Sequence, residues 1–378
     1  MSARSDNRPR VAVFTQNCFA QCDLPVLPGI AANADVKWTV FYPRDDKVGY
    51  QEEELRKAGE TAGASTRTVR LRNRLRSFAG ALELWKLLTE LRAHRPDTLY
   101  VNALGMPWLA FMVRALFPPR KVVWAVHDVQ DHHFKKLHHP QTLYRKFLFN
   151  AFPRFHFLSK GQETAFRKLV PGKTTHYAPL APTDFGPRSA APSERPFRFL
   201  FFGFIAPRKG VDVLIDAAQE LHRRGLDDFR VAIAGKCSDW APYQARIRNP
   251  ELFELDIRPV PNDVVRDLYS GAHWLVMPYR DITQSGPMSL AMNYSVPTIS
   301  SDLDGFREFV QEGETGLIFK LDDPVSLADA MQEAMSPGRW EVCRARQSEW
   351  FQSHFSLSRC VELYRSFLLP AGNRPPRE

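Results

Sequence analysis

The stretch FRFLFFGFIAPRKGVDVLID, residues 197–216, decides the fold of this chain. It opens with an apolar run of β-strand type, turns at a glycine and a proline, and continues with apolar residues at helical spacing. A strand, a tight turn and a helix in this order form the repeating unit of a parallel α/β sheet. Similar units lie on both sides, so we interpret residue 197 as the start of a second series.

Strand-like runs alternate with helical patterns through both halves of the 378 residues. They are RVAVFTQ, VKWTVFY, TLYVNA, KVVWAVHD and RFHFLS in the first half, and FRFLFFG, RVAIAG, WLVMPY and PTISS in the second. This rhythm predicts an α/β protein with two Rossmann-like, doubly wound domains facing a cleft. The proline-rich stretch from His176 to Pro196 indicates the linker. The predicted parts are an N-terminal domain (1–182), a linker (183–196), a C-terminal domain (197–355), and a helix and tail (356–378) that would pack on the N-terminal domain.

Composition narrows the class of partner. The net charge of +9 and pI near 9.4 favour an anionic partner, yet no zinc-finger, RRM or basic-zipper pattern is present, so we expect no nucleic acid. No apolar run reaches about 18 residues and the N-terminus lacks the pattern of a secretory signal. We therefore expect a cytoplasmic protein, or one held peripherally at the inner face of the membrane.

The turn at residues 203–210 has the chemistry of a diphosphate site. Gly203 ends a strand-like run, and Arg208 and Lys209 stand where a helix should begin. Backbone amides at a helix start, joined by two cations, bind phosphate oxygens well. A solvated basic helix start is the alternative for this motif alone.

A second phosphate-binding motif follows the run WLVMPY. Thr283, Gln284, Ser285 and Gly286 precede a helical pattern and offer hydroxyls, an amide and unobstructed backbone N–H groups. Ser285 is equally suited to be the N-cap of that helix, and the two roles are compatible.

These blocks together resemble family 4 retaining glycosyltransferases of GT-B architecture, especially the subset with FFGxIxPxKG and TQSG. The resemblance covers most of residues 197–335, including a glycine turn with its glutamate, Asp304 to Glu308, and an EGxTGL turn at 312–317. It implies a hexosyltransferase that moves a sugar, with retention, from a nucleoside-diphosphate donor to a glycan or lipid-linked acceptor. It also implies donor contacts from Glu308 and from the residues of both loops, with neither metal nor cofactor, because the sugar nucleotide is a substrate.

The sequence departs from this family at three positions. Many relatives carry a pair of glutamates where alignment on Pro297 puts Ile282 and Leu290, and an arginine where Phe204 stands. These losses leave two rival hypotheses open. One is a non-catalytic nucleotide-sugar-binding or scaffolding subunit, and the other is a sugar-nucleotide epimerase of the same fold, although an epimerase needs carboxylates that are missing here.

In the first half, His127 and Asp128 directly follow a strand-like run, at the edge where cleft residues belong. The resemblance makes His127 a contact of the donor sugar, so both residues are catalytic candidates. A purely structural histidine is the alternative. The histidines at 132, 133, 138 and 139 lack the spacing of a metal site, and we expect no metal.

Residues 66–88 mix arginines with Leu, Phe and Trp ahead of a helix. Such a mixture suits peripheral contact with an anionic bilayer, as a lipid-linked acceptor would require, or a buried helix with a charged outer face. The triplet from Asp302 to Asp304 has the DxD pattern of a cation site, but its place after a strand-like run indicates a turn.

Overall fold

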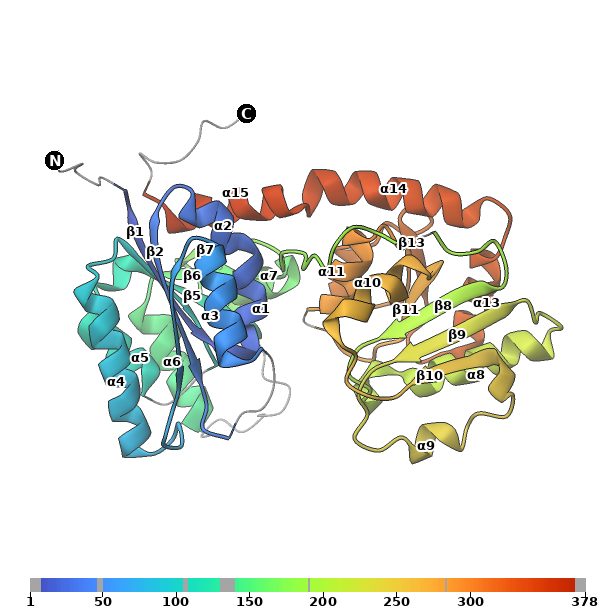
Figure 1. Ribbon diagram of the computed structural model, residues 1–378, viewed down its shortest axis with the longest axis horizontal. Helices are drawn as coiled ribbons and strands as arrows, with labels where there is room; N and C mark the ends of the chain where they lie inside the picture. The colour runs from blue at the N-terminus through green and yellow to red at the C-terminus, as the bar shows by residue number, and fades with distance from the viewer. Residues whose placement is uncertain are drawn as a thin grey trace. The chain divides into compact units, whose positions relative to one another are not determined.

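The computed structural model describes residues 8–45, 50–104, 108–129, 140–189, 191–282 and 284–370. The chain forms two compact units, Met1–Ala181 together with Leu357–Glu378, and Pro182–Ser356. Each unit is built around a parallel β-sheet covered by helices (Figure 1). The predicted fold class of two Rossmann-like α/β domains is therefore confirmed.

The first unit holds a seven-stranded parallel sheet in the order β3-β2-β1-β4-β5-β6-β7. Its central strands are buried on both faces, which is why they appear as nearly continuous apolar runs. The strands are β1 (Arg10–Gln16), β2 (Asp35–Tyr42), β3 (Ser65–Arg70), β4 (Thr98–Asn102), β5 (Val122–Val126), β6 (Arg154–Phe157) and β7 (Thr174–Tyr177).

Helices cover both faces of this sheet. The side chains of successive residues along a strand point alternately to its two faces, so each strand contributes to two cores. Along β1, Val11 and Val13 enter one core, whereas Ala12 and Phe14 enter the other. On the first side lie α1 (Ala20–Asp23), α2 (Leu27–Ala31), α3 (Glu52–Thr61) and α15 (Leu357–Leu368). On the second lie α4 (Phe78–Ala93), α5 (Leu109–Leu116), α6 (Pro140–Ala151) and α7 (Lys160–Leu169). Short 3-10 turns are η1 (Asn17–Phe19), η2 (Leu24–Val26) and η3 (Pro119–Lys121).

The C-terminal helix α15 is part of the first core. Tyr364 and Phe367 pack against Tyr100 of β4, with ring centroids 6.2 and 6.4 Å away. The guanidinium of Arg365 donates two hydrogen bonds to the carbonyl of Gly29, at 2.6 and 2.8 Å. A helix from the end of the sequence thus completes a domain built from its beginning.

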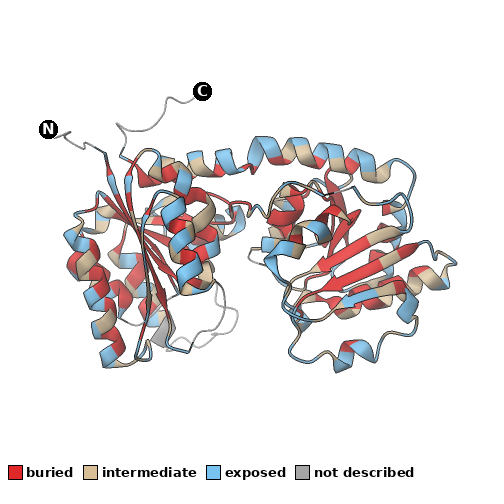
Figure 2. Ribbon diagram, in the orientation of Figure 1, coloured by how far each residue is buried: buried red, intermediate tan, exposed pale blue. Residues whose placement is uncertain are grey.

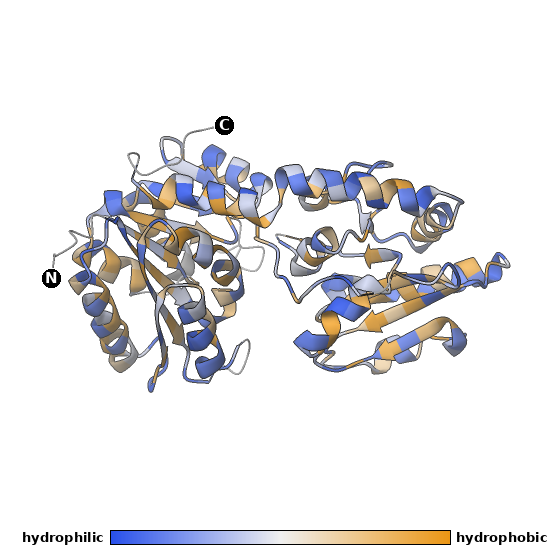
Figure 3. Cartoon of the chain, turned by 45° about the horizontal axis from the view of Figure 1, so that its top comes forward, coloured by the Kyte–Doolittle hydropathy of each residue, from blue (hydrophilic) through white to orange (hydrophobic). Residues whose placement is uncertain are grey.

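The second unit has a six-stranded parallel sheet in the order β10-β9-β8-β11-β12-β13. Its strands are β8 (Phe197–Phe202), β9 (Phe229–Ala234), β10 (Phe253–Asp256), β11 (Trp274–Met277), β12 (Thr298–Ser301) and β13 (Gly316–Phe319). Its helices are α8 (Val211–Arg223), α9 (Ala241–Gln244), α10 (Asn262–Ser270), α11 (Gly286–Asn293), α12 (Asp304–Arg307), α13 (Pro324–Ala334) and α14 (Arg339–His354), with 3-10 turns η4 (Pro207–Lys209) and η5 (Pro250–Leu252). The central strands are buried (Figure 2) and hydrophobic (Figure 3).

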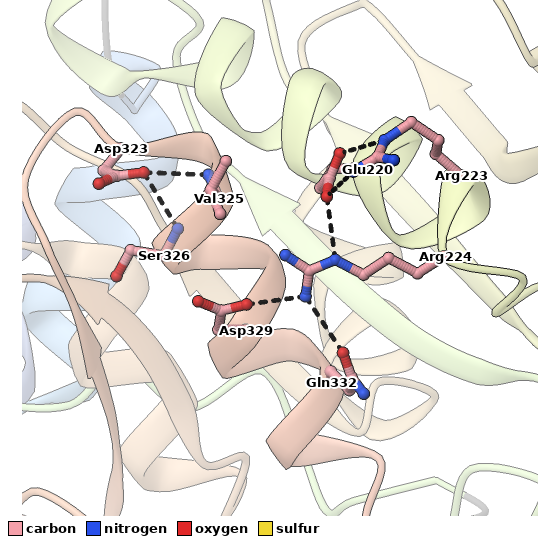
Figure 4. A network of polar contacts seen from close by, with 8 residues as sticks. All are labelled: Glu220, Arg223, Arg224, Asp323, Val325, Ser326, Asp329 and Gln332. Carbon is pink, nitrogen blue, oxygen red and sulfur yellow. Dashed lines mark hydrogen bonds and ion pairs between the residues drawn. The ribbon is translucent and has the colours of Figure 1, made fainter.

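Polar contacts tie neighbouring helices together at the surface of this unit. The guanidinium of Arg224, just after α8, donates to Glu220 at 3.0 Å and to Asp329 of α13 at 2.7 Å (Figure 4). The side chain of Asp323 caps α13 by accepting from the amides of Val325 and Ser326. These contacts fix α8 beside α13 on one face of the sheet.

Four strands escape the sequence analysis, and all four are sheet edges: β3, β7, β10 and β13. An edge strand has one neighbour and more exposed surface, so its residues need not form an apolar run. Along β3 no side chain is fully buried, and three of its six residues are exposed. The stretch that indicated the linker was taken to begin too early, because His176 belongs to β7; the predicted linker at 183–196 lies after that strand.

Candidate functional site

Two loops of the second unit follow its central strands and lie side by side. One, Gly203–Lys209, comes after β8, and the other, Tyr279–Ser285, comes after β11, the strand paired with β8. The backbone amide of Arg280 donates to the carbonyl of Arg208 at 2.8 Å, which joins the loops directly. The two predicted phosphate motifs are therefore brought together, at the carboxyl edge of the sheet where ligands bind in this kind of fold.

Tyr279 links the two motifs through its side chain. The Nζ atom of Lys209 lies 3.4 Å from the centroid of the Tyr279 ring, a cation–π contact. Burial raises the pKa of Tyr279 to about 12, so its phenol stays neutral. Burial and the charge of Arg208 lower the pKa of Lys209 to about 7. An anion beside Lys209 would restore its positive charge.

Ser285 is the N-cap of α11, as the sequence allowed. Its hydroxyl accepts a hydrogen bond from the amide of Met288 at 3.3 Å. Gly286 is the first residue of that helix and is exposed, and a Cβ atom placed on it would meet no atom within 4 Å. Open space therefore lies in front of Gly286, beside the start of the helix.

Glycine is required at two turns around this space. Gly203 has a φ of 124°, a left-handed conformation that other residues avoid, and a Cβ there would lie 3.4 Å from Pro287 of α11. Gly210 has a φ of 63° and packs so tightly that a Cβ would lie 1.8 Å from the carbonyl oxygen of Pro278. Both glycines let the loop after β8 approach the loop after β11.

The prediction that Arg208 and Lys209 stand at the start of a helix was wrong. Arg208 and Lys209 form the separate turn η4, and α8 begins only after Gly210. The first turn of α8 instead carries Asp212, whose carboxylate pairs with Arg280. The cations are thus held by a 3-10 turn.

Arg280, which sequence analysis missed, supports this turn. Its guanidinium pairs with Asp212 at 2.7 Å and Asp322 at 2.6 Å, and it donates to the carbonyl of Pro207 at 2.6 Å. Its place three residues after a buried strand was the available indication. Because its side chain contacts η4, α8 and the turn after β13, Arg280 positions the loop that carries Lys209.

The remaining predicted donor residues lie around the same loops. Thr283 falls outside the described residues, and Gln284, which follows it, is partly buried. Glu308 is the C-cap of α12 and is partly buried, two residues after Phe306, whose ring packs 5.6 Å from that of Tyr279. Gly305 of the same helix approaches Ile282 closely. The glycine–glutamate turn therefore borders the loop after β11.

The two positions without carboxylates are occupied by packing residues. Ile282 packs against the core of the second unit, and Leu290 of α11 is buried in it. The DxD-like triplet is a turn, as expected: Leu303 is the N-cap of α12, and Asp302 pairs with Arg307 at 2.7 Å.

In the first unit, His127 follows β5 and belongs to a polar network that sequence analysis did not foresee. Asn102 Nδ2 donates to Asp23 at 2.8 Å, so Asn102 Oδ1 is the acceptor for His127 Nε2 at 2.6 Å. Thr15 donates to the other oxygen of Asp23 at 2.6 Å, and Phe19 stacks on the imidazole at 3.8 Å.

This network sets the protonation of His127. Burial lowers the pKa of His127 to about 4, so the ring is neutral near pH 7, with its proton on Nε2 and a lone pair on Nδ1. Burial raises the pKa of Asp23 to about 7. Asp128 comes next in the chain, and its carbonyl accepts a hydrogen bond from Arg145 at 3.0 Å. Both the structural and the functional interpretation of His127 fit these contacts.

The described residues include no group of three His, Cys, Asp or Glu side chains placed to hold a metal ion. The histidines at 132, 133, 138 and 139 fall outside them. In the same described ranges, no helix has the length and apolar character to cross a bilayer.

Sequence comparison gives the second unit a family likeness. Residues 196–336 match the family model described as glycosyl transferases group 1. A D-inositol 3-phosphate glycosyltransferase of Corynebacterium urealyticum is 26% identical over 181 residues, or 44% of this chain and 42% of that protein. An uncharacterized glycosyltransferase of Methanocaldococcus jannaschii is 24% identical over 163 residues, or 43% of this chain and 45% of that protein. The chain thus spans less than half the length of these curated relatives.

Structural comparison extends the likeness to both units. Anabaena HepE, solved in complex with UDP and glucose, has a TM-score of 0.71 at 15% identity, covering 96% of this chain and 99% of that one. The sucrose-phosphate synthase of Thermosynechococcus elongatus has a TM-score of 0.72 at 16% identity, covering 95% and 99%. The chain therefore has the GT-B glycosyltransferase fold, with a region similar to group 1 glycosyltransferases at residues 196–336.

Proposed function

We propose that this protein transfers a hexosyl group, with retention and without a metal, from a nucleoside-diphosphate sugar to a glycan or lipid-linked acceptor. The observation that carries the proposal is the joining of the loops after β8 and β11, through the Arg280–Arg208 backbone hydrogen bond and the contact of Lys209 with Tyr279. The joined loops bring a cation close to a helix start and the open space at Gly286, on the strand edge where α/β sheets bind ligands.

The chemistry of this loop pair suits a leaving diphosphate. As the bond between sugar and phosphate breaks, negative charge grows on the phosphate oxygens. Arg208 and Lys209 supply positive charge there, and the amide of Gly286 supplies a hydrogen-bond donor at the start of α11. The next residue, Pro287, has no N–H, and the amide of Met288 donates to Ser285. Groups that meet this developing charge lower the barrier more than they tighten substrate binding.

The other residues take supporting roles in the proposal. Gly203, Gln284 and Glu308 lie on or beside the donor loops, and Thr283, which falls outside the described residues, is assigned to the donor site from the sequence motif alone. In the first unit, assigned to the acceptor side, neutral His127 orients the transferred sugar by hydrogen bonding, beside Asp128. Retention and the family 4 assignment rest on the sequence resemblance.

Substitution of Gly286 tests the donor site. Gly286→Val places a branched side chain in the open space without a clash, so the fold should persist while nucleoside-diphosphate binding collapses. Ser285→Ala should cost roughly 1 kcal/mol of stability through loss of the cap. Binding is measured by calorimetry, and folding by circular dichroism.

Gly161→Val is the matched control. Gly161 lies in the first turn of α7 in the first unit, without a positive φ, and its nearest contact for a Cβ is the Ser159 hydroxyl at 3.5 Å. This variant should bind nucleotide like the wild type. Wild-type affinity in a folded Gly286→Val protein would refute the donor-site assignment.

The missing carboxylates at Ile282 and Leu290 favour one competing function, a nucleotide-sugar-binding subunit without catalysis. Incubation with radiolabelled sugar nucleotides, with and without membrane or glycan acceptors, separates the two. Transfer to an acceptor supports the proposal. Binding without turnover would favour the subunit, and interconversion of the free sugar nucleotide would indicate an epimerase.

A further inference from the structure

Exposed apolar side chains gather on one part of the first unit. Within the described residues five aromatic side chains are exposed, and only Phe204 lies in the second unit. The other four belong to α4, α5 and the residue before α5. Together with neighbouring leucines they form what we call the carboxyl-edge patch: Phe78, Leu82, Trp85, Leu104, Trp108, Phe111 and Leu143.

The patch spans three adjacent helices on one face of the sheet. Contacts join α4 to α5 and α5 to α6, and the three helices lie next to one another (Figure 1). Phe111 of α5 stacks on Phe147 of α6 with centroids 3.8 Å apart. Phe78, Leu82 and Trp85 follow the spacing of one helix face, and Phe78 is 77% exposed. The outer face of α4 is thus apolar over its first half. A helix that served only to cover the sheet would carry charged side chains on that face.

The position of the patch in the topology is informative. In a parallel sheet each connecting helix runs back against the strands, so its N-terminal half lies at the carboxyl edge. Every patch residue lies in, or just before, the N-terminal half of α4, α5 or α6. His127 and Asp128 follow β5 at the same edge.

A basic loop is fastened beside the patch. Arg72, Arg74 and Arg76 precede α4 with exposed side chains. The loop is held by a hydrogen bond from the Ser77 amide to the Arg74 carbonyl at 2.9 Å, and Glu83 accepts from the Arg72 amide at 2.8 Å. A Cβ at Gly80 would lie 2.3 Å from the Arg74 carbonyl oxygen, so the backbone of the loop at Arg74 packs against the helix start.

The charge around the patch identifies its partner. The loop before α4 and the N-terminal halves of the three helices, residues 71–85, 108–112 and 140–145, contain four arginines but one acidic residue, Glu83. A second copy of the same face would meet it with like charge. Exposed Trp and Phe surrounded by Arg is instead the composition that inserts at the boundary of an anionic bilayer.

We infer that the carboxyl-edge patch docks this protein on an anionic lipid bilayer. The apolar side chains enter the headgroup boundary while Arg72, Arg74 and Arg76 contact lipid phosphates. Docking would bring a membrane-anchored acceptor to the strand edge that carries His127. This last step rests on the proposed transferase function, whereas bilayer binding itself does not.

Vesicle sedimentation of the full chain tests the inference. Vesicles of phosphatidylcholine with roughly 30% phosphatidylglycerol should bind the protein, and vesicles of phosphatidylcholine alone should not. The Arg72→Glu, Arg74→Glu, Arg76→Glu triple variant should lose at least about a hundredfold in partitioning, since each cation near an anionic surface contributes about fivefold. The Phe78→Ser, Leu82→Ser, Trp85→Ser triple variant should lose binding without unfolding, because these side chains are exposed.

Matched variants provide the controls. Leu169→Ser, Leu255→Ser and Val342→Ser remove three other exposed apolar side chains, and Lys57→Glu, Lys168→Glu and Arg359→Glu reverse three other exposed charges. Both control triples should sediment like the wild type.

Several outcomes would overturn the inference. The wild-type protein could bind neutral and anionic vesicles equally, or bind neither kind. Alternatively, the glutamate or the serine variant of the patch could bind anionic vesicles as well as the wild type does. A wild-type dimer that the serine variant abolishes would show instead that a second copy covers the patch. Calorimetry with a nucleoside diphosphate reports separately on the donor site, so failure of the bilayer contact is distinguishable from failure of the proposed function.

Discussion

Lys209 should take up a proton when a nucleoside diphosphate binds. Burial and Arg208 hold the pKa of Lys209 near 7, so the free protein carries about half a proton there at pH 7 and about one tenth at pH 8. A diphosphate beside the ammonium would return its pKa toward 10.5. Uptake should therefore be about 0.5 proton at pH 7 and about 0.9 at pH 8. By linkage, the dissociation constant should rise about tenfold per pH unit above 7.

Calorimetry in buffers of different ionisation enthalpy measures this uptake directly. Because the terminal phosphate of the nucleotide also titrates near pH 6, the informative quantity is the difference between wild type and Lys209→Arg. Arginine stays charged at every pH tested, so this variant should bind without the Lys209 proton. Lys209→Met should lose both the proton uptake and most of the affinity, with the fold intact.

Equal proton uptake in the wild type and in Lys209→Arg, at both pH 7 and pH 8, would refute the reasoning. It would mean that the ammonium on Tyr279 does not meet the phosphate. Unchanged affinity in Lys209→Met would remove Lys209 from the site altogether.

Three further predictions concern the two units. Arg280→Met should lower the free energy of unfolding by roughly 1–3 kcal/mol, measured by thermal unfolding, because Asp212 and Asp322 lose a charged partner. It should also weaken nucleotide binding, because η4 loses its support. Unaltered binding would contradict the positioning role of Arg280. Folding raises the pKa of Asp23 from 3.8 to about 7, so its contribution to stability is complete below pH 4 and is lost, by up to about 4 kcal/mol, as the pH rises through 7. Asp23→Asn should flatten that slope in denaturant unfolding at a series of pH values, and an unchanged slope would count against the assignment. EDTA should leave transferase activity unaltered, and loss that magnesium restores would show that a metal takes part.

The central strands were predictable because a strand buried on both faces is built almost entirely from apolar residues. β1 and β11 are nearly all buried, and β8 is buried at its centre, so each stands out as a largely apolar run. Edge strands such as β3 face solvent on part of their surface, and arginine and threonine are tolerated there. The alternation of central strands and helices was enough to predict the α/β class and the start of the second unit.

The residue types of the candidate site were predictable from the sequence, but the contacts among these residues were not. Glycines, adjacent cations and a Ser-Gly helix start are local features, and their residue types alone indicate phosphate binding. Arg280 and Asn102 were missed because their roles depend on partners far away in sequence. Asn102 contacts a carboxylate 79 residues earlier and a histidine 25 residues later.

The sequence by itself determined which segments form the buried strands and which loops hold anion-binding groups, since both follow from short-range composition. Only the tertiary structure decided which loops meet. The pairing of β8 with β11 brings Lys209 onto Tyr279, 70 residues away, and the order of the first sheet brings Asp23 to Asn102. The exposed apolar face of α4 was also a tertiary outcome, because helical spacing does not tell which side the core will cover.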